Sequence, residues 1–350
     1  MSRSQMLAVD AMGGDHAPEA IIAGLDIAAE RHQLAQFLIF GDEARVAPLI
    51  AASKRLKGRC TLRHTSETIT GDMKPTVALR LRDSSMRRAI DSVLAGDAAG
   101  VVSAGNTGAL LALSKIVLKT MNGIDRPAMA ATAPSAKGDV VMLDLGLNVV
   151  CDSRNLTEFA LMGDVFARIV LGLPAPTIGL LNIGSEEGKG DEVLNAAAAS
   201  LRESPIAKQF HGFVEGHDIT AGTVDVVVTD GFTGNVALKT GEGALKLVAQ
   251  LLRSVFSAGP LAKMGYIFAR GALKRLKETL DPRRYNGAVL LGLNGVVVKS
   301  HGGTDALGFA HAVDVALDMI SNDFNSRIAE GLTAMDRALL SAKPMAAPNV

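Results

Sequence analysis

The residues best suited to chemistry follow the last apolar run of the chain, where Lys299 and His301 stand next to Gly302 and Gly303. Glycine lets a ligand approach the backbone N–H groups closely, and a neighbouring cation attracts negative charge. The segment therefore suits the binding of an anion such as phosphate. Taken alone, it is explained equally well as a core strand that turns through glycines into the next helix.

Three other turns have the same make-up as this one. The four turns span 10–18, 104–108, 229–235 and 301–305, and each follows a short apolar run. Glycine permits close approach of the backbone, while Ser, Thr or Asn can cap the next helix and leave its first N–H groups available to a ligand. An ordinary helix cap explains any one of them better, but four in one chain favour a shared anionic ligand.

Several common catalytic and cofactor motifs are missing from the sequence. It contains no GxGxxG, no GxSxG and no HExxH, and the segment Gly184–Gly190 lacks the spacing and the final Ser or Thr of a Walker A loop. Cys60 and Cys151 lie in neither a CxxC pair nor a Cys/His cluster with metal spacing. We therefore expect no cofactor, no covalent serine chemistry and no catalytic metal.

The composition is that of a globular protein of the cell interior. Its 350 residues are 48% hydrophobic and 21% charged, enough for one large core or two joined lobes. The formal net charge is zero and Trp is absent, which argues against a nucleic-acid binder. Two cysteines, no apolar signal segment and no run of 18 apolar residues lead us to expect a cytoplasmic protein.

Short apolar runs alternate with longer segments of helical periodicity, the pattern of strands and crossover helices in a parallel sheet. The expected strands are Met6–Val9, Phe37–Phe40, Thr61–His64, Gly100–Ser103, Val140–Leu143, Thr177–Ile183, Val224–Val228 and Ala288–Val298. The expected helices are Glu19–Arg31, Ser85–Ala95, Thr107–Thr120, Thr157–Leu171, Asp191–Glu203, Val236–Phe256, Asp305–Ser321 and Asp323–Leu340. The fold class is therefore α/β, a three-layer α/β/α sandwich with a largely parallel sheet. One catalytic domain is expected over residues 1–342, with room for two lobes around a cleft, followed by a flexible tail at 343–350.

A strongly basic segment lies at residues 251–284, where eight Lys and Arg residues and two acidic residues give a net charge of +6. Apolar residues recur between the charges at helical spacing, which predicts a projecting pair of amphipathic helices broken near Gly271. Three interpretations remain open: ordinary helices that face the core, a surface for anionic lipid, and a docking site for an acidic carrier protein. The residues assigned to such docking are Lys263, Arg270, Lys274, Arg275 and Lys277.

Taken together, these motifs resemble the PlsX family, the phosphate acyltransferases of bacterial phospholipid synthesis. The resemblance spans residues 6–340 and rests on Val9–Pro18, Ser103–Ala109, Gly123–Pro127, Asn182–Gly190, Asp230–Asn235 and Tyr285–Gly303. Leu147 and Phe213 depart from the family pattern, at positions where a small residue and an Asn are usual. The resemblance implies a homodimer and an architecture similar to that of the isocitrate and isopropylmalate dehydrogenases.

The resemblance also implies a reaction. An acyl group would pass from acyl carrier protein to inorganic phosphate, and a membrane acyltransferase acting on glycerol 3-phosphate would consume the acyl phosphate. Because such a product is poorly soluble, the enzyme would work peripherally attached to the anionic inner face of the cell membrane. A CoA-dependent phosphate acyltransferase, a dehydrogenase of similar architecture and a non-catalytic scaffold are the alternatives.

This chemistry needs positioning and charge rather than a covalent nucleophile, because phosphate is a dianionic nucleophile near neutral pH and a thiol is a good leaving group. The catalytic residues we assign are Lys189, Lys299 and His301, which would neutralise charge or protonate the sulfur, and His16, which would orient the reacting groups. Phosphate or the acyl oxygen would contact Gly13, Gly14, Ser103, Gly105, Asn106, Thr107, Thr233, Gly234, Asn235, Asn294 and Gly302, with Asp10, Asp144 and Asp230 orienting these groups. The plainer alternatives are N-cap carboxylates for the aspartates and a solvated side chain for Lys189.

Overall fold

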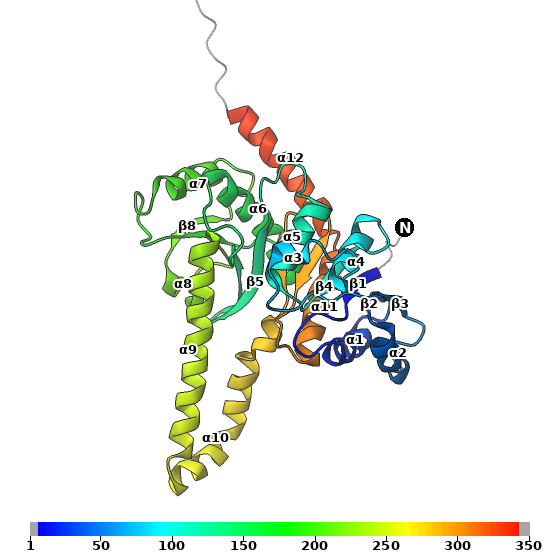
Figure 1. Ribbon diagram of the computed structural model, residues 1–350. Coiled ribbons are helices and arrows are strands. Elements are labelled where there is room, and N and C mark those ends of the chain that lie inside the picture. Colours follow the sequence, from blue (N-terminus) through cyan, green and yellow to red (C-terminus); the bar gives the residue numbers. More distant parts are fainter. Residues whose placement is uncertain (1–5, 343–350) are drawn as a thin grey trace, which may run out of the picture.

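A single sheet organises the chain in the computed structural model, which describes residues 6–342 (Figure 1). Within that range the sheet has eleven strands in the order β3-β2-β1-β4-β11-β10-β5-β6-β9-β7-β8. The strands are β1 (Met6–Asp10), β2 (Gln36–Gly41), β3 (Cys60–His64), β4 (Gly100–Ser103), β5 (Ala128–Ser135), β6 (Gly138–Leu143), β7 (Ile178–Leu181), β8 (Phe210–Val214), β9 (Val226–Val228), β10 (Ala288–Leu291) and β11 (Val296–Lys299).

The sheet reverses direction at its centre. The pairs β11–β10, β10–β5 and β5–β6 are antiparallel, whereas the other neighbouring pairs of the described sheet are parallel. Strands β6, β9, β7 and β8 consequently run opposite to β3, β2, β1, β4 and β11. The prediction of a largely parallel sheet is confirmed, and the carboxyl ends of its strands form two separate groups.

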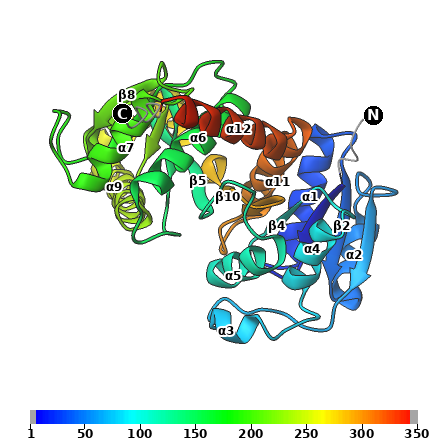
Figure 2. The same ribbon diagram turned by 90° about the horizontal axis from the view of Figure 1, so that it is seen from above.

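Helices cover both faces of the sheet, as the three-layer prediction requires. Leu7 and Val9 of β1 belong to one core with helices α1, α6 and α11, whereas Ala8 between them belongs to a second core with α4 and α5. The helices are α1 (Glu19–Arg31), α2 (Glu43–Ala52), α3 (Pro75–Ala78), α4 (Ser85–Leu94), α5 (Thr107–Leu118), α6 (Ser153–Val170), α7 (Glu192–Arg202), α8 (Gly216–Ala221), α9 (Gly231–Ser257), α10 (Pro260–Thr279), α11 (Ala306–Ser321) and α12 (Phe324–Ala342). Figure 2 shows α1 to α5 gathered on one side of the molecule and α7 and α9 on the other, with β5 and β10 between them.

Three expected elements differ most from the structure, while the bounds of others differ by one or two residues. The strand expected at Ala288–Val298 is two antiparallel strands, because the chain turns at Gly292, whose φ is +84°, and returns as β11. Helix α9 begins at Gly231 rather than Val236, and α6 begins at Ser153 rather than Thr157, where Asp152 and Asn155 form a capping box. In each case a polar capping residue, Asp230 or Asp152, starts the helix earlier than its apolar residues indicate.

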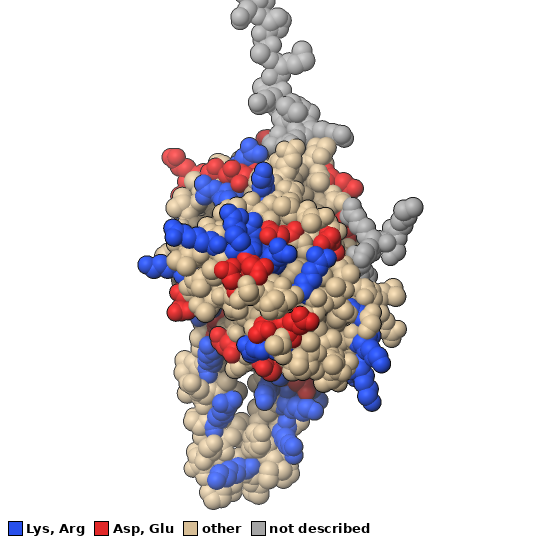
Figure 3. All heavy atoms as spheres, turned by 45° about the vertical axis from the view of Figure 1, so that its right-hand side comes forward, with Lys and Arg blue, Asp and Glu red and all other residues tan. Residues whose placement is uncertain are grey.

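The basic segment includes the end of α9, all of α10 and the residues that follow it, and these two helices form a hairpin that projects from the sheet (Figure 1). The break expected near Gly271 is wrong, because α10 continues through that residue and the chain instead reverses at Ala258 and Gly259. Helix α10 has no buried residue, and its Lys and Arg side chains lie among exposed apolar ones (Figure 3). None of the helices in the described range is long and apolar enough to cross a membrane. The tail expected at 343–350 lies outside the described residues.

Candidate functional site

Three of the four predicted turns meet at one edge of the sheet. Strand β4 pairs in parallel with both β1 and β11, and Ser103 is in register with Asp10 and Lys299. Asp15 N donates a hydrogen bond of 2.9 Å to Gly302 O, which joins the first and last of these turns. We call residues 10–15, 103–108 and 299–303 the glycine-turn cluster.

Asp10 is the buried centre of this cluster. Its carboxylate accepts hydrogen bonds from the hydroxyls of Ser85 and Ser103, each at 2.6 Å, and from Met12 N at 3.3 Å. Burial raises the pKa of Asp10, while the two hydroxyls, Met12 N and the charge of Lys299 act in the opposite direction. Asp10 and Ser103 therefore hold the turns together from inside, and neither side chain has a spare hydrogen bond aimed outward.

Lys299 places a cation beneath the same turns. Its side chain is buried, and Nζ donates to the carbonyl oxygens of Ala104, at 3.4 Å, and Ser300. Burial lowers the pKa of Lys299 to about 8, and the nearby charges of Asp10 and Asp15 oppose that change. The cluster thus contains a buried lysine that can carry positive charge close to exposed backbone.

The N-terminus of α5 supplies donors for an anion. Asn106 caps the helix by accepting from Ala109 N at 2.9 Å, and its amide nitrogen donates to Gly71 O at 2.8 Å and Met73 O at 2.9 Å. The Asn106 side chain is therefore fully used within the protein. By contrast, the backbone N–H groups of residues 106–108 form no hydrogen bond to any part of the chain that the structure describes. Three successive N–H groups beside Lys299 are suited to phosphate.

The remaining predicted residues of this edge lie around those donors. His16, His301 and Thr107 are exposed, and His301 Nδ1 accepts from Gly303 N at 3.1 Å. Gly13 is buried, and a Cβ built there would lie 2.7 Å from Gly105 N, so the first two turns touch through glycine. The cluster combines a buried lysine with two exposed imidazoles.

Except for Asn294, the other predicted site residues lie in the opposite half of the sheet, after β6, β9 and β7. We call residues 144–150, 182–190 and 230–236 the second cluster. Asp230 caps α9, accepting from Thr233 N at 2.9 Å and from the Thr233 hydroxyl at 2.7 Å. Asn235 is exposed one residue beyond the buried Gly234. Within the described residues, no hydrogen bond or ion pair links the second cluster to the glycine-turn cluster.

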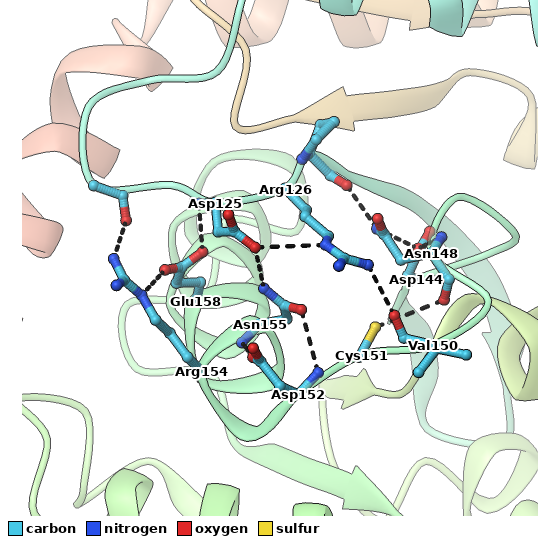
Figure 4. A network of polar contacts seen from close by, with 12 residues as sticks. Asp125, Arg126, Asp144, Asn148, Val150, Cys151, Asp152, Arg154, Asn155 and Glu158 are labelled. Carbon is cyan, nitrogen blue, oxygen red and sulfur yellow. Dashed lines mark hydrogen bonds and ion pairs between the residues drawn. The ribbon is translucent and has the colours of Figure 1, made fainter.

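Asp144 fixes the loop that follows β6 (Figure 4). Its carboxylate is fully buried and accepts from Met129 N at 3.0 Å, Leu147 N at 3.2 Å and both nitrogens of Asn148 at 2.7 and 2.9 Å. Gly231 N then donates to Asn148 O at 2.7 Å, which attaches the start of α9 to this loop. Asp144 therefore supports the second cluster from inside, as Asp10 supports the first.

Lys189 lies on the exposed loop between β7 and α7. Its carbonyl oxygen accepts from the side-chain amides of Asn182, at 3.1 Å, and Asn195, at 3.3 Å, so its backbone is held in place. Its side chain passes close to Gly184, where an added Cβ would come within 3.2 Å of Lys189 Cγ. The ammonium group has no hydrogen-bond or ion-pair partner in the described chain, which leaves it available to a ligand.

Asn294 joins neither cluster. It lies in the turn between β10 and β11, at the other end of β11 from Lys299, and its amide donates to the carbonyl oxygens of Leu118 and Thr120. Its amide therefore has a structural use, and it is remote along β11 from the buried lysine.

Two residues that contact these clusters were not predicted. Ser85 reaches Asp10 from α4, 75 positions away in the sequence, and no local pattern indicates that contact. Arg126 donates to Val150 O at 3.0 Å and so places a second cation beside the second cluster (Figure 4). The motif Gly123–Pro127 was the available signal for Arg126.

The buried lysine makes stability depend on pH in a testable way. Because the pKa of Lys299 is about 8 in the folded state and 10.5 ordinarily, the unfolded chain binds more protons between those values. The free energy of unfolding should therefore rise with pH from 8 to 10.5, relative to Lys299→Met, by about 3 kcal/mol. Urea titrations of both proteins at several pH values measure this difference, and a constant difference would contradict a lowered pKa.

Sequence comparisons indicate one family, and a structural comparison shows the same fold. The family described as "Fatty acid synthesis protein" matches residues 5–327. A phosphate acyltransferase of Acidiphilium cryptum is 72% identical over 327 residues, which cover 93% of this chain and 86% of that protein. Another, of Granulibacter bethesdensis, is 64% identical over 341 residues, 97% of this chain and 93% of that protein. A solved phosphotransacetylase from Streptococcus pyogenes, 17% identical, has the same fold with a TM-score of 0.60 over 90% of this chain and 93% of its own.

Proposed function

This chain belongs to the fatty acid synthesis protein family, and we propose that it transfers a fatty acyl group from acyl carrier protein to inorganic phosphate. The family expected from the motifs is confirmed, and transfer of an acyl group to phosphate is the activity for which its relatives are named. Acyl carrier protein as the donor rests on the sequence resemblance. The observation that carries the phosphate half is the set of three N–H groups at residues 106–108 beside the buried Lys299.

In the proposed reaction, phosphate lies on these N–H groups and attacks the thioester carbonyl. The new bond joins a phosphate oxygen to the carbonyl carbon, the carbon–sulfur bond breaks, and the carrier thiolate takes up a proton. Lys189, from the second cluster, stabilises the charge on the carbonyl oxygen or the departing sulfur, and His16 or His301 supplies the proton. Aligning two bound reactants contributes about 7–11 kcal/mol to lowering the barrier.

No cysteine of the chain is needed as a nucleophile in this scheme. Burial raises the pKa of Cys151 to about 12 and that of Cys60 to about 11, so both remain thiols near neutral pH. The proposed reaction also requires the second cluster, which carries Lys189, and the glycine-turn cluster to face one common space.

The assay combines the protein with acyl carrier thioester, with or without phosphate, and follows release of the carrier thiol. We expect release that depends on phosphate and yields acyl phosphate in equal amount. Acyl-CoA as the donor distinguishes the alternative phosphate acyltransferase, which would prefer it. Failure of phosphate to accelerate thiol release from either donor would contradict the function.

We propose that the α9–α10 hairpin holds the protein on the anionic cytoplasmic face of the membrane. There a glycerol 3-phosphate acyltransferase would consume the acyl phosphate. The enzyme is proposed to work as a homodimer. Exposed Leu261, Ile267 and Phe268 lie beside Lys263 and Arg270 on α10, a combination that favours a lipid surface. At low salt the protein should sediment with vesicles rich in anionic lipid, and the double change Lys274→Glu and Arg275→Glu should weaken this at least tenfold. The matched double change Lys54→Glu and Lys57→Glu should leave vesicle binding unchanged. An equal loss of vesicle binding in both variants would argue against the hairpin as the membrane contact.

A further inference from the structure

Five large apolar side chains are exposed in the second cluster. The exposed fractions are 64% for Val149, 75% for Val150, 82% for Ile183, 63% for Phe232 and 51% for Val236. We call these five residues the apolar rim. Outside the α9–α10 hairpin, the other large apolar residues exposed in the described chain are single ones on different elements, such as Leu34 and Ile116. Grouped exposed apolar side chains indicate a binding surface.

The rim residues come from three adjacent strand ends. Strand β9 lies between β6 and β7, and Val228 is in register with both Leu143 and Leu180. Neighbouring strands are about 5 Å apart, so the three following loops leave the sheet side by side. The hydrogen bond from Gly231 N to Asn148 O joins the loop that carries Val149 and Val150 to the first turn of α9. Phe232 and Val236 are four residues apart, on one face of that helix.

The same loops carry the polar groups of the second cluster. Lys189 shares the β7–α7 loop with Ile183, while Thr233 and Asn235 lie between Phe232 and Val236 at the start of α9. An apolar strip beside a lysine suits a ligand with a polar reacting head and a long apolar chain. A protein partner fits less well, because the centres of protein interfaces are depleted of Lys and Glu, and this surface carries Lys189 and Glu186.

We propose that the apolar rim binds the alkyl chain of the acyl donor. This inference rests on the proposed function and adds to it the place where the fatty chain lies during transfer. Each methylene that leaves water on binding should raise kcat/KM about fourfold until the rim is covered. The enzyme should therefore favour long-chain donors over short-chain ones because of these five residues.

The test compares a palmitoyl and a butyryl donor on the same carrier protein. Phe232→Ser and Ile183→Ser remove exposed side chains, so neither opens a core cavity, and Leu34→Ser, at a residue 79% exposed, is the matched control. For each rim variant we expect kcat/KM to fall about tenfold with palmitoyl and by less than twofold with butyryl. The control should leave both values, and so their ratio, unchanged.

Two outcomes would overturn the inference. One is an equal fall in kcat/KM with the palmitoyl and the butyryl donor, which indicates damage to the polar site. The other is an unchanged ratio of the two kcat/KM values together with altered sedimentation of the protein, which makes the rim a contact between copies of the chain. Binding of a fluorescent polyene fatty acid, measured without phosphate, separates this inference from the proposed function. If the fatty acid binds in a way that depends on the rim but no acyl group is transferred, the proposed function is refuted and the proposed chain-binding site is kept. If neither rim substitution changes fatty-acid binding, the proposed chain-binding site is refuted.

Discussion

Replacing Lys189 with methionine should lower kcat by about 100- to 1,000-fold while the thermal midpoint stays nearly the same. The large effect on rate follows because a positioned charge that stabilises a transition state contributes this much when its surroundings are preorganised. The small effect on stability follows because the Lys189 side chain is exposed, with its ammonium group unpartnered within the described residues. The rate is measured at saturating phosphate and acyl donor, and the midpoint by thermal unfolding.

Lys208→Met is the matched control for this change. Lys208 is also exposed and lies in the same half of the sheet, between α7 and β8, outside the second cluster. Its substitution should leave kcat within twofold of the wild-type value. A Lys189→Met protein with wild-type turnover at saturating phosphate would remove this residue from the chemistry.

Gly234→Ala should destabilise the protein by about 3 kcal/mol. Gly234 is buried in the first turn of α9, and a Cβ built there would overlap the carbonyl oxygen of Asp144 and lie 2.9 Å from Thr229 Cγ2. The backbone of Asp144 cannot move aside, because its carboxylate is fixed by the hydrogen bonds of the loop. The loss is measured as a lower free energy of unfolding in urea.

Gly241→Ala, on the same helix, should have the opposite sign. A Cβ at Gly241 meets no atom within 4 Å, so alanine there improves helix propensity by up to about 1 kcal/mol. The two substitutions change the same group in the same helix, and only the contact with the Asp144 loop differs. Equal effects of the two alanines would show that α9 does not pack on that loop as described.

The strands that sequence predicted well are those whose residues are almost all buried and apolar, such as β1 and β9. Strand β5 was missed because Ala128–Ser135 consists of small residues with a Pro at 134, and β8 because His211 and Gly212 interrupt its apolar run. Their positions come from pairing with β6 and β7, contacts that no local pattern records.

The sequence predicted a pair of helices within 251–284, broken near Gly271, whereas in the structure both belong to the single helix α10, which pairs with α9. Glycine inside a helix lowers its stability without ending it, and α10 continues through Gly271. The better signal was the pair Gly259 and Pro260, because proline favours the first position of a helix, and Pro260 begins α10.

Of the four turns predicted to share one anion, three lie together in the structure, and several of their polar side chains point inward. The turns after β1, β4 and β11 meet because parallel neighbours bring their carboxyl ends to one edge. Asp10, Ser103 and Asn106 nevertheless use their side chains within the protein, and backbone N–H groups face the proposed ligand. Whether a polar side chain points inward depends on partners such as Ser85, distant in sequence.

The reversal of strand direction at the centre of the sheet has an evolutionary consequence. The proposed phosphate site and the apolar rim are built from different halves, and their supporting carboxylates, Asp10 and Asp144, belong to separate hydrogen-bond networks. On the proposal above, substitutions in the rim would change the preference for fatty chains of different length while the proposed phosphate site keeps its geometry. The two specificities of this chain could then change independently.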